Sequence, residues 1–198
     1  MTKITFTFDA VRPRPWLASF TIAAMAVLGS GAVLAQHAGK HHAQPYAGQE
    51  KRDIASLSDE DVRGFLDGRG MGLAKSAELK GYPGPMHVLE LAKELKLTPE
   101  QRRLVKAAFD RMQAKAKELG AAYIAAERAV DEAFKSGNAD ASTIAARVAE
   151  ANRLLGEVRL THLAAHIEIT PLLTPEQRAR YAVLRGYTAQ PGHQKHRH

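Results

Sequence analysis

The sequence predicts an all-α protein built on a long antiparallel helical hairpin with short flanking helices. Two long stretches with heptad spacing of apolar residues, separated by a few turn residues, indicate the two arms. The hexapeptide Leu-Thr-Pro-Glu-Gln-Arg occurs at positions 97–102 and again at 173–178. Each copy has the residues of a capped helix start, with Thr before Pro and Gln three positions after Thr.

The first 35 residues have the pattern of a secretory signal peptide. Basic residues precede an apolar run at positions 16–34, which ends in small or apolar residues suited to cleavage after Ala35. An uncleaved membrane anchor is the alternative, because the run approaches the roughly 20 residues that span a bilayer. Gly29 and Gly31 interrupt the run and favour cleavage. We therefore expect a periplasmic protein.

The absence of cysteine and the positive net charge limit the metal sites and the partners that this protein can have. The chain has no cysteine, which excludes disulfides and thiolate metal sites. Its formal net charge is +7, and the segment that follows the signal peptide remains basic. Because an exported protein rarely meets nucleic acid, we expect acidic or amphipathic proteins, or anionic lipid surfaces, as partners.

Short helices are expected before the hairpin. The polar segment 36–56 is expected to be a disordered tail, and the folded domain to span 57–187. Ser58 begins a first helix, which the glycines at 68–72 end, and a second covers 73–79. A third begins at Pro85. After the domain, residues 188–198 form a second polar tail rich in histidine.

The first arm of the hairpin is predicted over residues 99–135, about 55 Å long at 1.5 Å per residue. Its apolar seam is Val105, Phe109, Met112, Ala116, Leu119, Tyr123, Ala126, Val130 and Ala133. The returning seam is Ile144, Val148, Ala151, Leu155, Val158, His162, Ala165 and Ile169. Since the arms have similar lengths, both hexapeptides are expected at the open end of the hairpin, as neighbours in space. One hairpin has only two narrow apolar stripes, so we also expect a homodimer.

The signal peptide, the long hairpin and the two Leu-Thr-x-x-Gln motifs resemble the LTxxQ family of periplasmic stress proteins. That family contains Spy- and CpxP-like chaperones and the related heavy-metal-resistance proteins and sensors. The resemblance covers roughly residues 85–187 and implies an all-α, cradle-shaped dimer that acts without ATP. It implies either that unfolding proteins are held on a concave surface or that metal is bound.

The hexapeptides are interpreted as structural caps, and direct contact with client proteins is the alternative. The motif residues are Leu97, Thr98, Gln101, Leu173, Thr174 and Gln177. A client-binding surface would combine basic and apolar residues of the hairpin, because unfolded proteins expose apolar surface. The candidates are Arg102, Arg103, Lys106, Ile124, Phe134, Arg147, Leu154 and Leu163. The alternative is a solvated face with ion pairs between residues three or four apart.

Histidines are the candidate metal ligands, for Zn, Cu or Ni. His162 and His166 stand at i and i+4 on one helix face, with Glu168 or a histidine of a second subunit as the expected further ligand. A hydrogen-bonded core histidine is the alternative for His162. Further candidate ligands are the histidines of the two tails, and the alternative is that these tails are only soluble spacers. The tail histidines are His37, His41, His42, His193, His196 and His198. Methionines 71, 86 and 112 are soft ligands or adaptable contacts, and core packing is favoured for Met112.

The sequence favours an ATP-independent, chaperone-like stress protein that binds unfolded or misfolded periplasmic proteins and requires no cofactor. The alternative is a periplasmic heavy-metal-binding resistance or sensor protein. A third interpretation is a partner of a membrane sensor protein. No catalytic motif is recognisable, and we expect no enzymatic activity.

Overall fold

The computed structural model describes residues 44–188, and this part of the chain is helical, without a β-strand. The all-α prediction is therefore confirmed. In chain order the elements are α1 (Asp59–Leu66), α2 (Lys75–Glu78), α3 (Pro85–Glu90), α4 (Pro99–Lys135), α5 (Ala141–Ile169), the short 3-10 helix η1 (Thr170–Leu172) and α6 (Pro175–Leu184).

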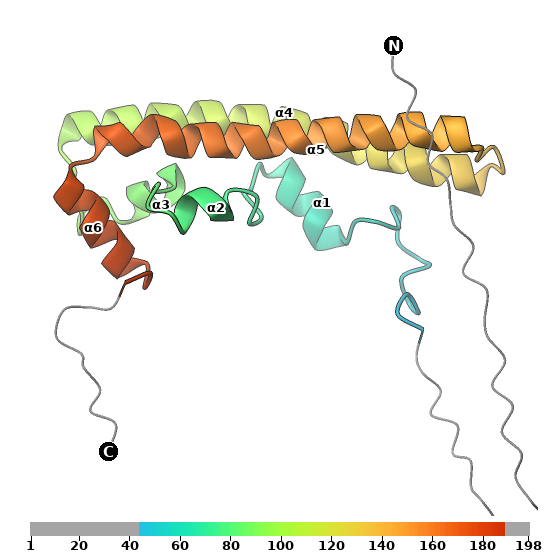
Figure 1. The fold of residues 1–198 in the computed structure, drawn as a ribbon, viewed down its shortest axis with the longest axis horizontal. Coiled ribbons are helices and arrows are strands. Elements are labelled where there is room, and N and C mark those ends of the chain that lie inside the picture. The colour runs from blue at the N-terminus through green and yellow to red at the C-terminus, as the bar shows by residue number, and fades with distance from the viewer. Residues whose placement is uncertain (1–43, 189–198) are drawn as a thin grey trace, which may run out of the picture. The chain divides into compact units, whose positions relative to one another are not determined.

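Helices α4 and α5 form the predicted hairpin and run side by side along their whole length (Figure 1). Gly137, with φ of +71°, lies in the turn after α4. Asp140 then begins α5, because its carboxylate accepts hydrogen bonds from the backbone N–H groups of Ser142 and Thr143 at 2.9 and 3.0 Å. The expected seam residues are buried or half-buried except Val148, which is exposed. There, the half-buried Arg147 donates to the Ala129 carbonyl across the hairpin at 2.6 Å.

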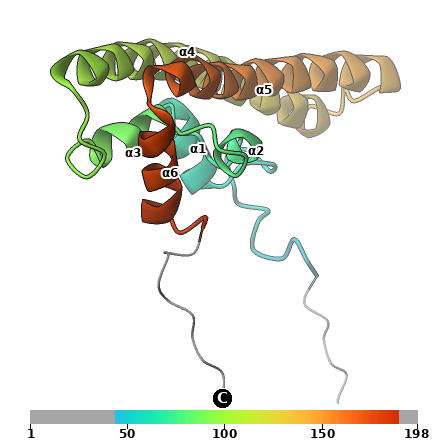
Figure 2. The ribbon, with the colours of Figure 1, turned by 60° about the vertical axis from the view of Figure 1, so that its left-hand side comes forward.

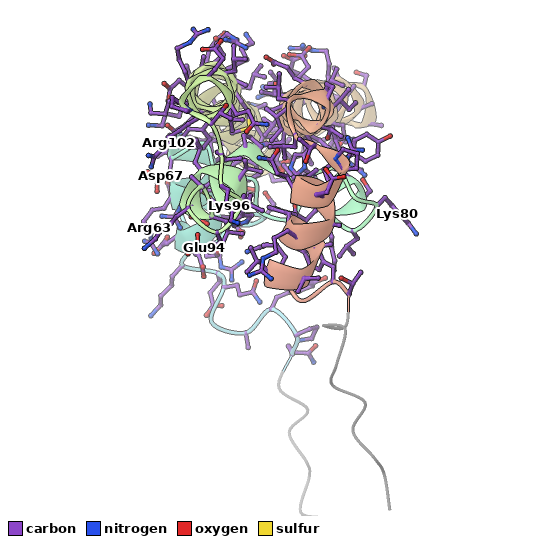
Figure 3. The ribbon with its side chains drawn as sticks, turned by 90° about the vertical axis from the view of Figure 1, so that its left-hand side faces the viewer. Arg63, Asp67, Lys80, Glu94, Lys96 and Arg102 are labelled. Atoms are coloured by element: carbon purple, nitrogen blue, oxygen red, sulfur yellow. The ribbon has the colours of Figure 1, made fainter. Side chains whose placement is uncertain are left out.

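The helices before the hairpin pack on one side of it (Figures 2 and 3). Phe65 of α1 makes an edge-to-face contact with Tyr123 of α4, with ring centroids 4.8 Å apart. They belong to a core cluster that also includes Ile54, Leu57, Leu119, Ile124, Ala151, Leu154 and Val158. Ile54 is only 1% exposed, so the folded part begins before position 57, and the expected tail boundary is wrong. Asp53 pairs with Arg128 at 2.6 Å beside it.

A second cluster lies at the open end of the hairpin, where α3, η1 and α6 meet the arms. Its buried residues are Val88, Leu95, Val105, Ala108, Ile169, Leu173 and Tyr181. Leu97 and Leu172 pack against it while half-buried. Leu97 and Leu173, the leucines that precede the two threonine caps, are therefore both part of this one core.

Both hexapeptides form complete capping boxes. The Thr98 hydroxyl accepts from the Gln101 backbone N–H at 3.1 Å, and the Thr98 N–H donates to Gln101 Oε1 at 3.0 Å. Thr174 and Gln177 repeat the arrangement at 3.2 and 2.9 Å. The predicted structural capping role of the motifs is confirmed.

The two glutamine amides also bond to each other. Gln101 Nε2 donates to Gln177 Oε1 at 2.8 Å, and Gln177 Nε2 donates to Gln101 Oε1 at 3.0 Å. The second amide hydrogen of each goes to a backbone carbonyl, that of Leu172 for Gln101 and that of Leu95 for Gln177. Each amide thus makes two donor and two acceptor bonds, the full capacity of the group. We call this arrangement the glutamine clamp; it confirms that the two motifs are neighbours.

Gly120 of α4 should tolerate no side chain, because α1 crosses the hairpin there. A Cβ at position 120 would lie 2.4 Å from the Phe65 carbonyl oxygen, a backbone atom. We expect Gly120→Ala to lower the free energy of unfolding by about 3 kcal/mol, the upper range for overpacking. Gly156→Ala on α5 is the matched control, since nothing lies within 4 Å of a Cβ there. It should stabilise the helix by about 0.5–1 kcal/mol. Urea unfolding of both variants measures this, and equal effects would contradict the crossing.

Candidate functional site

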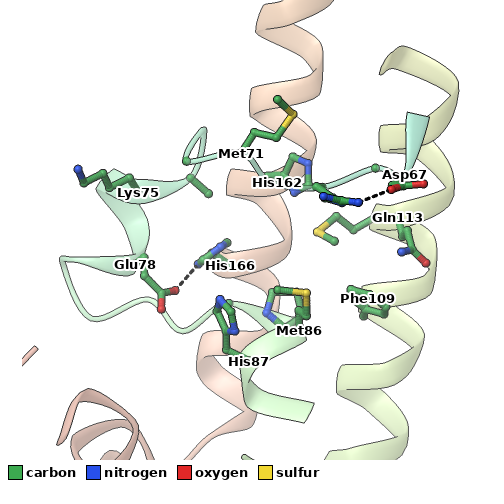
Figure 4. Close-up of a pocket in the computed structure, with 18 residues that line it drawn as sticks. Asp67, Met71, Lys75, Glu78, Met86, His87, Phe109, Gln113, His162 and His166 are labelled. Atoms are coloured by element: carbon green, nitrogen blue, oxygen red, sulfur yellow. Dashed lines mark hydrogen bonds and ion pairs between the residues drawn. The ribbon is translucent and has the colours of Figure 1, made fainter. Parts of the chain in front are cut away.

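A pocket of about 490 Å³ lies between the hairpin and the segments that pack on it. Its walls come from the loop 67–72, α2, the start of α3, and one face each of α4 and α5 (Figure 4). Most of the exposed lining is apolar. Such a concave, mainly apolar site with a few converging polar groups is the usual form of a ligand pocket.

Every histidine and every methionine of residues 44–188 lines this one pocket. They are His87, His162, His166, Met71, Met86 and Met112. They come from four separate segments: the loop before α2, then α3, α4 and α5. Imidazole nitrogen and thioether sulfur are both ligands for borderline and soft metal ions, so the pocket gathers the metal-binding side chains of the described chain.

His162 lies in the wall with one nitrogen free. The side chain is 4% exposed, and a Cβ at Gly70 would lie 3.7 Å from its Nδ1. Within residues 44–188, its Nε2 is buried and has no hydrogen-bond partner. Burial lowers the pKa of His162, and His166 lowers it further, while the Arg69 carbonyl acts in the opposite direction. The ring is therefore neutral at pH 7, as a metal-binding imidazole must be.

His166 is oriented by a backbone carbonyl. Its Nδ1 lies 2.8 Å from the Tyr82 carbonyl oxygen. Because a carbonyl only accepts, Nδ1 carries the hydrogen, and in the neutral ring Nε2 has the lone pair. Gly84 lies close against this ring, since a Cβ there would be 3.0 Å from Cε1. A histidine held at one nitrogen by a carbonyl is the usual form of a metal-ligating histidine.

Glu78 of α2 connects the pocket to helix α6 and the residues directly after it. Its Oε1 accepts from the hydroxyls of Tyr181 and Tyr187 at 2.5 and 2.9 Å, and Arg185 Nε lies 3.4 Å away. Burial and the neighbouring Glu78 raise the pKa of Tyr181, so this hydroxyl keeps its proton. Oε2 lies 3.7 Å from His166 Nδ1 and is buried without a hydrogen-bond partner among the described residues.

The three methionines differ in exposure. Met112 is buried on α4, whereas Met71 and Met86 are 39% and 46% exposed. Met71 has φ of +44°, a backbone conformation uncommon outside glycine. The predicted core role of Met112 is consistent with its burial, but it lines the pocket as well.

The prediction that Glu168 is a further ligand beside His162 and His166 is wrong. Its carboxylate is exposed and pairs with Arg111 at 2.5 Å. It does not line the pocket, because two residues along a helix turn a side chain by about 200° from His166. Among residues 44–188, no three His, Cys, Asp or Glu side chains are grouped so as to hold a metal ion. Sequence reasoning missed His87, Gly84 and Glu78, whose short helices carry no periodic signal.

The proposed client-binding residues are not one exposed surface. Ile124 and Leu154 are buried, because α1 covers a second face of the hairpin beside the seam. Arg103 and Lys106 pair with Glu100 and Asp110, as the solvated-face alternative predicts. Of the rest, Arg102, which is labelled in Figure 3, and Phe134 are exposed. Arg147 and Leu163 are half-buried.

Several predicted features lie outside the described residues. These are the signal peptide, with its cleavage point, and the tail histidines His37, His41, His42, His193, His196 and His198. Within residues 44–188, no helix has the length and apolar character that crossing a membrane requires.

Acidification should destabilise the protein through His162. Because the pKa of His162 is lowered in the folded state, the unfolded chain takes up a proton first as pH falls below the ordinary histidine pKa of 6.5. The contribution is fully present above pH 6.5 and is lost as pH falls through the lowered pKa. The free energy of unfolding, measured in urea from about pH 7.5 to 5, should fall less steeply in His162→Gln than in the parent. Identical slopes would contradict this role.

Comparison with known protein families identifies a match over the folded domain. A family model described as heavy-metal resistance matches residues 73–180, more than half of the 198-residue chain. Searches of curated proteins and of solved structures give no match. The matched range contains both hexapeptides, α4, α5 and His162 and His166. The chain therefore belongs to the heavy-metal-resistance family.

Proposed function

We propose that this protein is an exported metal-binding protein whose pocket holds an ion through His162 and His166. The observation that carries the proposal is the gathering of all described histidines and methionines in one pocket, with His162 Nε2 buried and unpartnered there. A buried nitrogen without a partner is costly, and a bound cation would remove that cost.

The two histidines are suited to act together. In each ring, Nδ1 faces backbone: at Gly70 for His162 and at the Tyr82 carbonyl for His166. Nε2 is therefore the nitrogen whose lone pair is available to a metal ion. The lowered pKa of His162 keeps that lone pair available in mild acid. The signal-peptide pattern supports a function in the periplasm, where such a protein would sequester or sense metal.

Metal titration of the mature chain tests the proposal. The six tail histidines are first replaced by glutamine, so that they cannot contribute binding. Calorimetry with Zn(II), Ni(II) and Cu(II), and chelator competition with Cu(I), should then detect at least one ion at about micromolar affinity or tighter. His162→Gln and His166→Gln should each weaken it by about tenfold or more.

His87→Gln is the matched control for this titration. His87 also lines the pocket, but among residues 44–188 it is not grouped with His162 and His166 so that the three could hold one ion. It should change affinity by less than about threefold, well below the loss expected for a ligand. Binding that disappears with the tail histidines and does not respond to His162 or His166 would refute the proposal.

A second candidate is the holding of unfolding proteins without ATP, favoured by apolar residues exposed on the hairpin. Phe134, Leu160 and Ile167 are each more than 60% exposed. Large exposed apolar side chains mark contact surfaces, either for clients or for a second copy of this chain. Homodimer formation is a proposal of the same standing.

An aggregation assay distinguishes these uses of the apolar surface. Without nucleotide, the protein should suppress aggregation of a thermally unfolding test protein, and Leu160→Gln with Ile167→Gln should reduce the suppression. Sedimentation of the same variants reports on the dimer. No suppression at several-fold molar excess would remove the second candidate, and the metal proposal would stand.

A further inference from the structure

We propose that the pocket selects a soft monovalent cation, Cu(I) or its analogue Ag(I), and that one or two of the thioethers of Met71, Met86 and Met112 complete the ligand set of His162 and His166. The inference rests on the proposed function, because it assigns the ion class for the same pocket.

The pocket lacks the donors that a divalent ion requires. Zn(II) sites take three or four ligands from His, Cys, Asp and Glu. The chain has no cysteine, and no three such side chains are grouped for a metal among residues 44–188. The half-buried carboxylate in the wall, Glu78, accepts at Oε1 from Tyr181 and Tyr187. Its Oε2 lies 3.7 Å from Nδ1 of His166, the nitrogen that bears the hydrogen, and not at the Nε2 that would bind the ion. Two imidazoles therefore stand without a hard third ligand.

Thioether sulfur is the donor that remains. The three methionines approach from three elements: Met71 from the loop before α2, Met86 from α3 and Met112 from α4. In Figure 4, Met71 lies beside His162, and Met86 lies beside His87 at the opposite side of the pocket. Thioethers bind Cu(I) and are poor ligands for hard divalent ions. With three rotatable bonds each, methionines can also close on an ion without backbone movement.

Burial alone does not account for these positions. The Met71 side chain packs against Gly64 of α1, but Met71 and Met86 remain 39% and 46% exposed. Met71 also keeps a φ of +44°, which is an unfavourable backbone conformation for a side chain of this kind. No other methionine occurs in residues 44–188, so all three contribute to one pocket rather than to packing throughout the fold.

The charge balance of the pocket also favours a monovalent ion. Imidazole and thioether ligands are neutral, so the charge of the ion is not cancelled by its ligands. The cost of placing an ion in an apolar site rises with the square of its charge, which penalises divalent ions most. The Glu78 carboxylate, 3.7 Å from His166, is the acidic group beside this ligand set, and it is shared with Arg185.

Chelator competition tests the inference in the full mature chain with its six tail histidines replaced. Cu(I) affinity is measured anaerobically against bicinchoninate, Ag(I) by displacement of Cu(I), and Zn(II) and Ni(II) by calorimetry. The test variant is Met71→Leu/Met86→Leu/Met112→Leu, because leucine keeps the volume and removes the sulfur. If the triple variant fails to fold by circular dichroism, the exposed pair Met71→Leu and Met86→Leu replaces it.

The inference predicts a loss of Cu(I) and Ag(I) affinity of about tenfold or more in the methionine variant. Zn(II) and Ni(II) binding, where present, should be unchanged, while His162→Gln weakens every ion. Cu(I) affinity that is insensitive to the methionines would overturn the inference. If Zn(II) or Ni(II) then still binds through the histidines, the proposed function stands. Absence of binding by all four ions would refute both.

Discussion

The glutamine clamp is the interaction on which the arrangement of this protein depends. Gln101 and Gln177 each cap their own helix and bond to the other amide, so the starts of α4 and α6 are fixed to each other. Their remaining hydrogens tie the clamp to the carbonyls of Leu172 and Leu95, one on each approaching segment. A half-buried amide pair with every donor and acceptor satisfied stabilises a single geometry, because any displacement leaves polar groups unpaired.

The pocket is a consequence of this fixed end. Helix α6 leaves the clamp and brings Tyr181 to Glu78, and Glu78 lies beside His166. The Tyr181 hydroxyl also accepts from the Gly84 backbone N–H at 3.3 Å, which places the start of α3 against the same histidine. The Leu-Thr-x-x-Gln motif therefore has no ligand role in this account. It positions the segments that supply the donors.

Local rules predicted the hairpin and its caps well. The bounds of α4, at Pro99 and Lys135, follow from the threonine cap and from the turn at Gly137. The burial of Ile124 and Leu154 could not be predicted, because it depends on α1 crossing the hairpin and not on the seam. The spacing of His162 and His166 predicted one pair of donors, and the three methionines were named as possible ligands without a predicted partner. Met71 and Met86 lie in a loop and in the short helix α3, where no periodicity indicates which side chains converge.

A double-mutant cycle on the two glutamines tests the central claim most directly. Gln101→Leu, Gln177→Leu and the double variant are compared by the free energy of unfolding in urea, with Asn152→Leu on the exposed side of α5 as a control for loss of an amide. The clamp predicts that each single change costs about 1–3 kcal/mol and that the double costs clearly less than their sum. Strictly additive costs would show that each amide only caps its own helix, and would contradict the account.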